Sequence, residues 1–166
     1  SQNVASKHLY LQFGANSGLL SIIDESGLQF ARTLGGNLDK YLVGLAQRME
    51  LPKEECLQKL ESGDEGAIQA ATETSRMFAR DISREISIAI QYFEEILGGV
   101  SPDAGLVFSH LSFPQAFLQT LSTQTGVCFQ SGEHSPWNMG EKSEKWIVSA
   151  GLSGYFDGAD ARREVA

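Results

Sequence analysis

The chain has 166 residues, and 42% of them are hydrophobic, which is enough to build the core of one domain. The 13 basic and 21 acidic side chains give a formal net charge of −8, which argues against a nucleic-acid backbone or an anionic membrane surface as a partner. No apolar run approaches the roughly 18–20 residues that cross a bilayer, so we expect no direct membrane insertion.

Three short runs near the start of the chain have strand-like patterns: the first and third alternate apolar with polar residues, and the middle one is a short apolar run. They cover residues 8–13, 19–23 and 28–34, and turns that contain glycine separate them. Alternation with a period of two is typical of strands that bury one face, and short turns join neighbouring antiparallel strands. The first part of the chain is therefore predicted to form a three-stranded antiparallel meander.

Helical spacing of apolar residues begins after Gly35 and Gly36, where Asn37 is a suitable N-cap. Helices are predicted over residues 38–49, 53–60 and 65–97, and the glycine pair 98–99 ends the third. The apolar stripe of this long helix consists of Phe78, Ile82, Ile86, Ile90, Phe93 and Leu97.

The rest of the chain alternates strand and helix patterns. Strands are predicted over residues 105–110 and 127–129, with a helix over 114–124 between them. A polar loop over 131–145 and an apolar helix over 146–154 follow. Together with the meander, this order predicts an α/β (α+β) fold with a mixed sheet of about five strands packed with helices.

Two turns of small residues are the candidate binding elements. The first consists of Gly14, Ala15, Asn16 and Ser17, and the second of Gly35 and Gly36. Small residues let backbone amides come close to a phosphate. The alternative is structural, since a hairpin and the entry to a helix also need small residues. The residues alone leave both interpretations open.

Side chains that could carry catalysis or hold a metal form no recognisable pattern. The candidates are His8, His110 and His134 as ligands, and Ser109 and Ser112 as nucleophiles. The histidines lack the spacing of metal ligands, and no nucleophile elbow surrounds either serine. We therefore predict no catalytic residue and no metal site.

The two cysteines and one tryptophan give further expectations. Cys56 and Cys128 are predicted to be reduced, with Cys128 buried in a strand between apolar neighbours. Trp137 stands in the polar loop, where it either folds back onto the domain or marks a contact surface.

An ordered set of short segments carries a family resemblance. The segments are residues 13–17, 30–36, 54–60, 84–93 and 150–152. In this order they resemble the second half of the actin-like ATPase superfamily, which has a ribonuclease H-like fold, and within it the PilM type of type IV pilus assembly protein. The resemblance covers most of residues 8–155.

The resemblance implies a domain organisation. Residues 8–156 correspond to actin-like subdomain II with a helical insertion at 37–63, between a disordered N-terminal end at 1–7 and a polar tail at 157–166. Because ATP lies between two halves in this superfamily, we expect the natural protein to contain a first half with its own phosphate loop.

Departures from the family pattern fall at the nucleotide-binding positions. Gln12 stands where the family has the aspartate linked to the metal, and Gly18 where it has a hydroxyl. Leu57 and Leu60 replace the ribose-binding glutamate and its lysine, and 110–111 replace a glycine pair. A neutral amide cannot hold the waters of Mg²⁺ as a carboxylate does. We therefore expect no ATPase activity and no cofactor, with ATP and Mg²⁺ bound only if the missing half is restored.

The resemblance also implies a function and a location. We expect a degenerate actin-like scaffold of a type IV pilus or related secretion platform, in the bacterial cytoplasm and held at the inner membrane by partners. The implied partner is a membrane-anchored pilus assembly protein that binds through its cytoplasmic N-terminal peptide. A homodimer through an exposed first strand or the Trp137 loop is a further expectation. The alternatives are half of an active ATP-binding ATPase or sugar-kinase-like enzyme, and a cytoplasmic module of a type II secretion protein.

Overall fold

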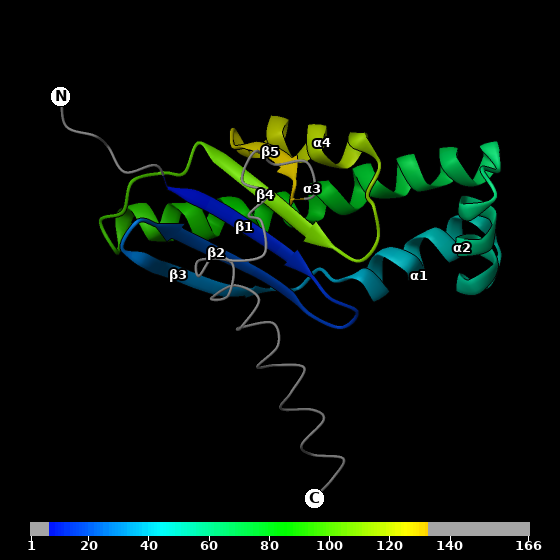
Figure 1. Ribbon diagram of the computed structural model, residues 1–166, viewed down its shortest axis with the longest axis horizontal. Helices are drawn as coiled ribbons and strands as arrows, with labels where there is room; N and C mark the ends of the chain where they lie inside the picture. Colours follow the sequence, from blue (N-terminus) through cyan, green and yellow to red (C-terminus); the bar gives the residue numbers. More distant parts are fainter. Residues whose placement is uncertain (1–6, 133–166) are drawn as a thin grey trace, which may run out of the picture.

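The computed structural model describes residues 7–132, which form a five-stranded sheet and four helices (Figure 1). The strands are β1 (His8–Phe13), β2 (Gly18–Asp24), β3 (Gly27–Leu34), β4 (Ala104–Ser109) and β5 (Cys128–Ser131). The helices are α1 (Leu38–Met49), α2 (Lys53–Glu61), α3 (Glu65–Glu95) and α4 (Gln115–Thr125). Each described element lies within a few residues of its predicted range.

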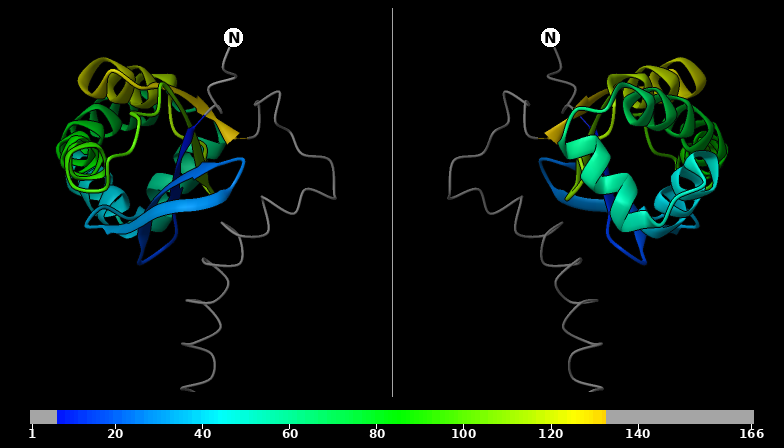
Figure 2. Two further views of the ribbon diagram at one scale, coloured as in Figure 1. Left: turned by 90° about the vertical axis from the view of Figure 1, so that its left-hand side faces the viewer. Right: turned by 90° about the vertical axis from the view of Figure 1, so that its right-hand side faces the viewer.

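The sheet is mixed, as the sequence predicts. Its strand order is β3-β2-β1-β4-β5, in which β1, β2 and β3 pair antiparallel while β4 lies parallel to both β1 and β5. Helices α3 and α4 cover one face of this sheet (Figure 2). The alternation in β1 follows from this arrangement, because Leu9, Leu11 and Phe13 point into the core between sheet and helices.

The expectation that an exposed first strand could pair with a second copy is wrong. β1 is the central strand, with its backbone paired to β2 on one side and to β4 on the other. Within residues 7–132 the edges of the sheet are β3 and β5. A central strand has no free backbone groups to offer to another chain.

Helix α3 carries the predicted apolar stripe with one correction. Its members from Phe78 to Phe93 are buried, whereas Leu97 is 51% exposed. The helix ends at Glu95, and Gly98 follows with a φ of 65°, so Leu97 falls in the turn after the last helical residue. A residue beyond the helix end no longer follows the 3.6-residue period, which is why the prediction failed there.

Helices α1 and α2 lie beyond the end of the sheet, at the right of Figure 1. The Asn37 side chain caps α1 by accepting a hydrogen bond of 2.9 Å from the Lys40 amide. Leu45 and Cys56 form a small second core with Ala71 of α3. These two helices occupy most of the segment that was expected to be a helical insertion.

Several expectations concern residues that the structure does not describe. The helix over 146–154, Trp137, His134, segment 150–152 and the tail 157–166 all lie outside residues 7–132. The predicted polar loop over 131–145 begins within the described residues, and its first residue, Ser131, belongs to β5.

At the start of the described residues, the ammonium nitrogen of Lys7 lies 5.3 Å from the ring centroid of Phe93. No helix of the described part is long and apolar enough to cross a membrane.

The prediction that Cys128 is buried is wrong, because its side chain points away from the helices and is exposed at the edge strand β5. Cys56 is 0% exposed, and burial raises the pKa of its thiol. We predict that a maleimide applied to the native protein modifies Cys128 within minutes, while Cys56 reacts only after denaturation. Peptide mass mapping distinguishes the two sites, and rapid labelling of Cys56 in the native protein would contradict the packing described here.

Candidate functional site

The two predicted turns lie side by side and are joined by backbone hydrogen bonds. The amides of Leu38 and Asp39 donate to the carbonyl oxygens of Gly14 and Ala15, at 3.0 and 2.9 Å. The start of α1 is therefore fixed to the hairpin between β1 and β2. The six residues predicted as a cradle, Gly14, Ala15, Asn16, Ser17, Gly35 and Gly36, thus belong to one small region of the fold.

Several amides in this region already have acceptors within the protein. The first-turn amides of α1 bind the hairpin carbonyls or the Asn37 cap. The Gly14 amide donates to the Ser17 carbonyl at 2.8 Å, and the Gly35 amide to Oε2 of Glu85 at 2.8 Å. Phosphate binding at a helix N-terminus uses such amides as donors. At these positions the donors are engaged, so the N-terminus of α1 is not a ready anion site.

Close packing against α3 explains Gly36, the second residue of the glycine pair. A Cβ atom on Gly36 would lie 2.8 Å from Cγ1 of Ile82, and one on Gly35 would lie 3.1 Å from Oε1 of Glu85. The Lys40 ammonium donates to the Gly35 carbonyl at 2.6 Å. Glu85 and Lys40 thus hold the turn at Gly35 from two sides. This favours the interpretation that the small residues serve the turn rather than a phosphate.

Gln12 lies near the end of β1, opposite Leu19 and Phe108 in the sheet. Its side-chain oxygen is buried and has no hydrogen-bond partner among the described residues. By alternation along the strand, the amide points to the face of the sheet opposite α3 and α4. An uncharged amide therefore stands next to the hairpin.

Most of the other residues that depart from the family pattern contribute to the packing of the fold. Leu60 packs against the small core formed with Cys56, and Leu57 is half-buried on the same helix. Leu111 packs against the main core after β4, whereas His110 is exposed. Among residues 7–132, no group of three or more histidine, cysteine or acidic side chains could hold a metal ion.

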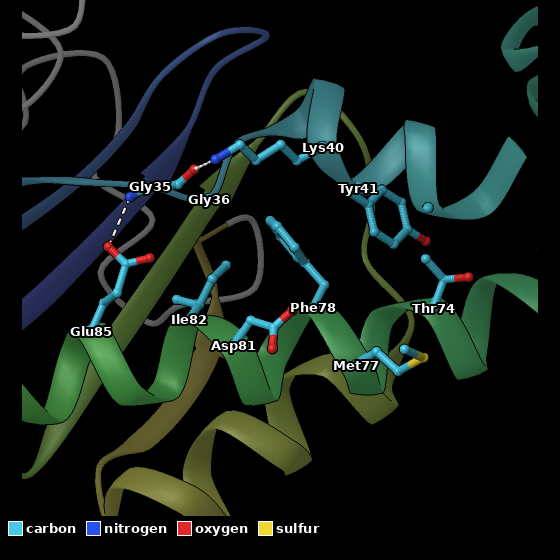
Figure 3. Close-up of a pocket in the computed structure, with 11 residues that line it drawn as sticks. Gly35, Gly36, Lys40, Tyr41, Thr74, Met77, Phe78, Asp81, Ile82 and Glu85 are labelled. Carbon is cyan, nitrogen blue, oxygen red and sulfur yellow. Dashed lines mark hydrogen bonds between the residues drawn. The ribbon is translucent and has the colours of Figure 1, made fainter. Parts of the chain in front are cut away.

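A cavity of about 280 Å³ lies between α1, α3 and the glycine pair (Figure 3). Its lining combines aromatic, aliphatic and charged side chains, mainly Tyr41, Met77, Phe78, Asp81, Ile82 and Glu85. Burial raises the pKa of the Tyr41 hydroxyl, so this hydroxyl is uncharged at neutral pH. Sequence reasoning missed the cavity, because its walls come from two helices whose relative placement no local pattern reveals.

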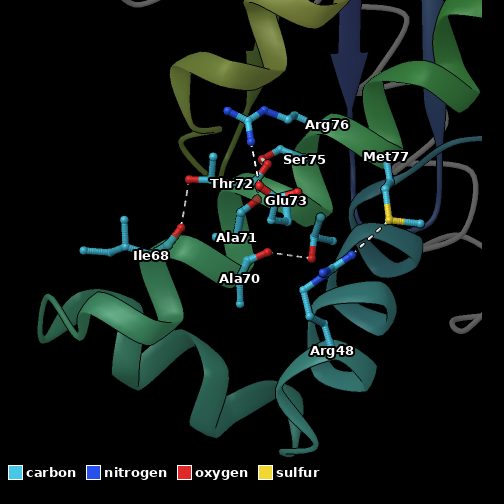
Figure 4. A network of polar contacts seen from close by, with 10 residues as sticks. Arg48, Ile68, Ala70, Ala71, Thr72, Glu73, Ser75, Arg76 and Met77 are labelled. Carbon is cyan, nitrogen blue, oxygen red and sulfur yellow. Dashed lines mark hydrogen bonds and ion pairs between the residues drawn. The ribbon is translucent and has the colours of Figure 1, made fainter.

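Polar side chains in the first half of α3 are engaged within the protein (Figure 4). The Thr74 hydroxyl donates to the Ala70 carbonyl at 2.8 Å, and Arg76 pairs with Glu73 at 2.6 Å. The guanidinium of Arg48 on α1 reaches the sulfur of Met77 on α3 at 3.0 Å. These contacts connect the two helices beside the cavity.

Comparisons with known proteins support the fold. The described structure matches a chain of the PilM–PilN type IV pilus biogenesis complex with a TM-score of 0.57 and 16% sequence identity. The match covers 76% of this chain and 35% of that one. The chain has the fold of the actin-like ATPases. At such low identity the likeness shows the fold alone.

Other solved structures resemble this actin-like domain less. The ethanolamine utilization protein EutJ from Carboxydothermus hydrogenoformans gives a TM-score of 0.45 at 13% identity, with 76% of this chain and 44% of that one covered. The apo ParM protein of pSK41 gives 0.47 at 16% identity, with 78% and 37% covered. No family model and no curated protein matches the sequence. The actin-like domain spans less than half of each of these three chains.

Proposed function

We propose that this actin-like domain is a scaffold without nucleotide turnover. It acts in the cytoplasm as part of the inner-membrane assembly platform of a bacterial type IV pilus or a related secretion system. It binds the cytoplasmic N-terminal peptide of a membrane-anchored assembly protein. The structural likeness to a chain of the PilM–PilN complex supports this choice of partner class.

The observation that carries the proposal is the neutral amide of Gln12 beside the hairpin. Mg²⁺ is bound through carboxylates and phosphates, and an amide oxygen supplies no compensating charge. The carboxylates that flank the two turns are already engaged, since Asp39 pairs with Lys53 and Glu85 accepts from the Gly35 amide. The actin-like fold here carries an uncharged amide at the position that the resemblance assigns to the metal-linked aspartate.

Calorimetry with synthetic peptides tests the binding role. We predict that one cytoplasmic N-terminal tail, among those of the single-span membrane proteins in the same cell's pilus and secretion machinery, gives saturable heat with this protein. A scrambled peptide of the same composition is the control and should bind more weakly. Absence of saturable heat with every tail would count against the proposal.

A further inference from the structure

The cavity between α1 and α3 has the character of a site for one basic side chain. We propose that it receives a lysine or arginine of the partner's cytoplasmic peptide, with the aliphatic stem against the aromatic wall and the charged end at Asp81. This inference rests on the proposed function, because it names the recognition site for that class of partner. Its location is separate from the hairpin turn and from Gln12.

The size of the cavity fits a side chain better than a cofactor. Its volume is about 280 Å³, whereas sites that enclose drug-sized ligands measure roughly 300–1,000 Å³. A nucleotide would not be enclosed in this space. The space is large enough to admit a single long side chain and leave the peptide backbone on the surface.

The walls suit a side chain that is apolar along its length and charged at its end. The rings of Tyr41 and Phe78 lie 5.7 Å apart and both project between the helices (Figure 3). Lysine and arginine bury their methylene stems against apolar surface and keep the charge in water. Aromatic faces also attract a cation that comes close to them.

Asp81 supplies the charge at the rim. Its carboxylate makes no ion pair within the described residues, although Arg84 follows one turn later on α3. The other charged groups of the lining are engaged, since Glu85 accepts from the Gly35 amide and Lys40 donates to the Gly35 carbonyl. Asp81 is therefore the group that remains available to an incoming cation.

Gly44 keeps the cavity open. It lies inside α1 without a positive φ, and a Cβ at this position would meet only Cγ2 of Thr74, at 3.4 Å. Glycine inside a helix costs about 1 kcal/mol relative to alanine. Neither the backbone nor packing requires glycine here, so its effect is to leave space between the helices.

Exposed apolar side chains continue the surface away from the cavity. Met77 at the rim is 55% exposed, and Ile88, three full turns later on the same face of α3, is 50% exposed. Tyr92, one further turn along, is 48% exposed. This row offers contacts to apolar residues that flank the basic side chain in a bound peptide.

Charge complementarity selects the partner. The chain carries a net charge of −8. Cytoplasmic segments next to membrane spans carry an excess of lysine and arginine. A tail of this kind is attracted to the acidic protein as a whole and supplies the side chain that the cavity accommodates.

Methyl NMR of the 166-residue chain, labelled at methionine and isoleucine, tests the site. The probe is the tripeptide acetyl-Leu-Lys-Leu-amide, and the analogue with norleucine in place of lysine removes only the charge. We expect saturable shifts at the Met77 and Ile82 methyl groups with the lysine peptide and weaker binding of the analogue. Shifts confined to other methyl groups, or no saturation, would overturn the proposal.

Variants separate the cavity from general charge attraction. Asp81→Asn is expected to weaken binding of the lysine peptide about three- to fivefold, while Glu94→Gln removes the same charge elsewhere on α3 and leaves binding unchanged. Gly44→Met should fill the cavity and abolish the shifts. Equal effects of the two charge variants, or full binding to Gly44→Met, would contradict the assignment. If a natural tail binds by calorimetry but Gly44→Met does not affect it, this inference fails and the proposed function stands.

Discussion

Replacing Phe117 by alanine is expected to lower the free energy of unfolding by about 4 kcal/mol, the cost typical of deleting a fully buried aromatic ring. Phe117 is 0% exposed and lies on α4. Its ring stacks on Phe113 at 4.1 Å and lies 6.0 and 5.9 Å from the rings of Phe13 and Phe78. The cluster therefore joins β1, α3 and α4, and its loss leaves a cavity where sheet and helices meet.

Urea unfolding followed by far-ultraviolet circular dichroism measures this effect. Phe117→Leu is the matched control, because it keeps an apolar side chain in the same place and should cost roughly half as much. A loss below about 1 kcal/mol for the alanine variant would mean that the site collapses around the missing ring. That result would contradict the central position of Phe117 in the core.

The second large effect is expected at Gly18, where alanine should cost about 3 kcal/mol because overpacking forces the backbone to move. A Cβ atom at this position would lie 2.1 Å from the carbonyl oxygen of Gly36. Neither atom belongs to a flexible side chain, so the turn at Gly36 must separate from β2. Since Gly36 packs on Ile82 of α3, the displacement would extend into the core.

Gly44→Ala is the matched control for Gly18→Ala, because the chemical change is identical and the surroundings differ. The added Cβ at Gly44 would make an ordinary contact with Thr74. Removing a helix-interior glycine should stabilise the protein by about 0.5–1 kcal/mol. Thermal unfolding of both variants gives the comparison. Equal stability of Gly18→Ala and the parent protein would show that the two turns are not in contact as described.

Local sequence patterns predicted most of the secondary structure, for identifiable reasons. Alternation in β1 and the stripe in α3 each reflect burial on one side of an element, which a period in the sequence records directly. Cys128 was misjudged because its apolar neighbours Val127 and Phe129 are both buried, while alternation turns Cys128 itself to the other side of an edge strand.

The candidate site was predicted in part. Small residues indicated the two turns as candidate binding elements. The sequence did not show that the Leu38 amide binds the Gly14 carbonyl or that Glu85 accepts from Gly35. These contacts join residues up to 50 positions apart. The cavity beside Asp81 likewise depends on how two helices pack, which no local period encodes.

The central proposal is that this domain has the actin-like fold without the capacity to bind Mg-ATP productively. Equilibrium titration of the natural full-length protein with a fluorescent Mg-ATP analogue tests it most directly, with Gln12→Asp measured in parallel. We predict no saturable binding to the parent protein up to a nucleotide concentration of about 1 mM. A dissociation constant of that size corresponds to a binding free energy of about −4 kcal/mol. Saturable, magnesium-dependent binding to the parent protein in the micromolar range would contradict the account.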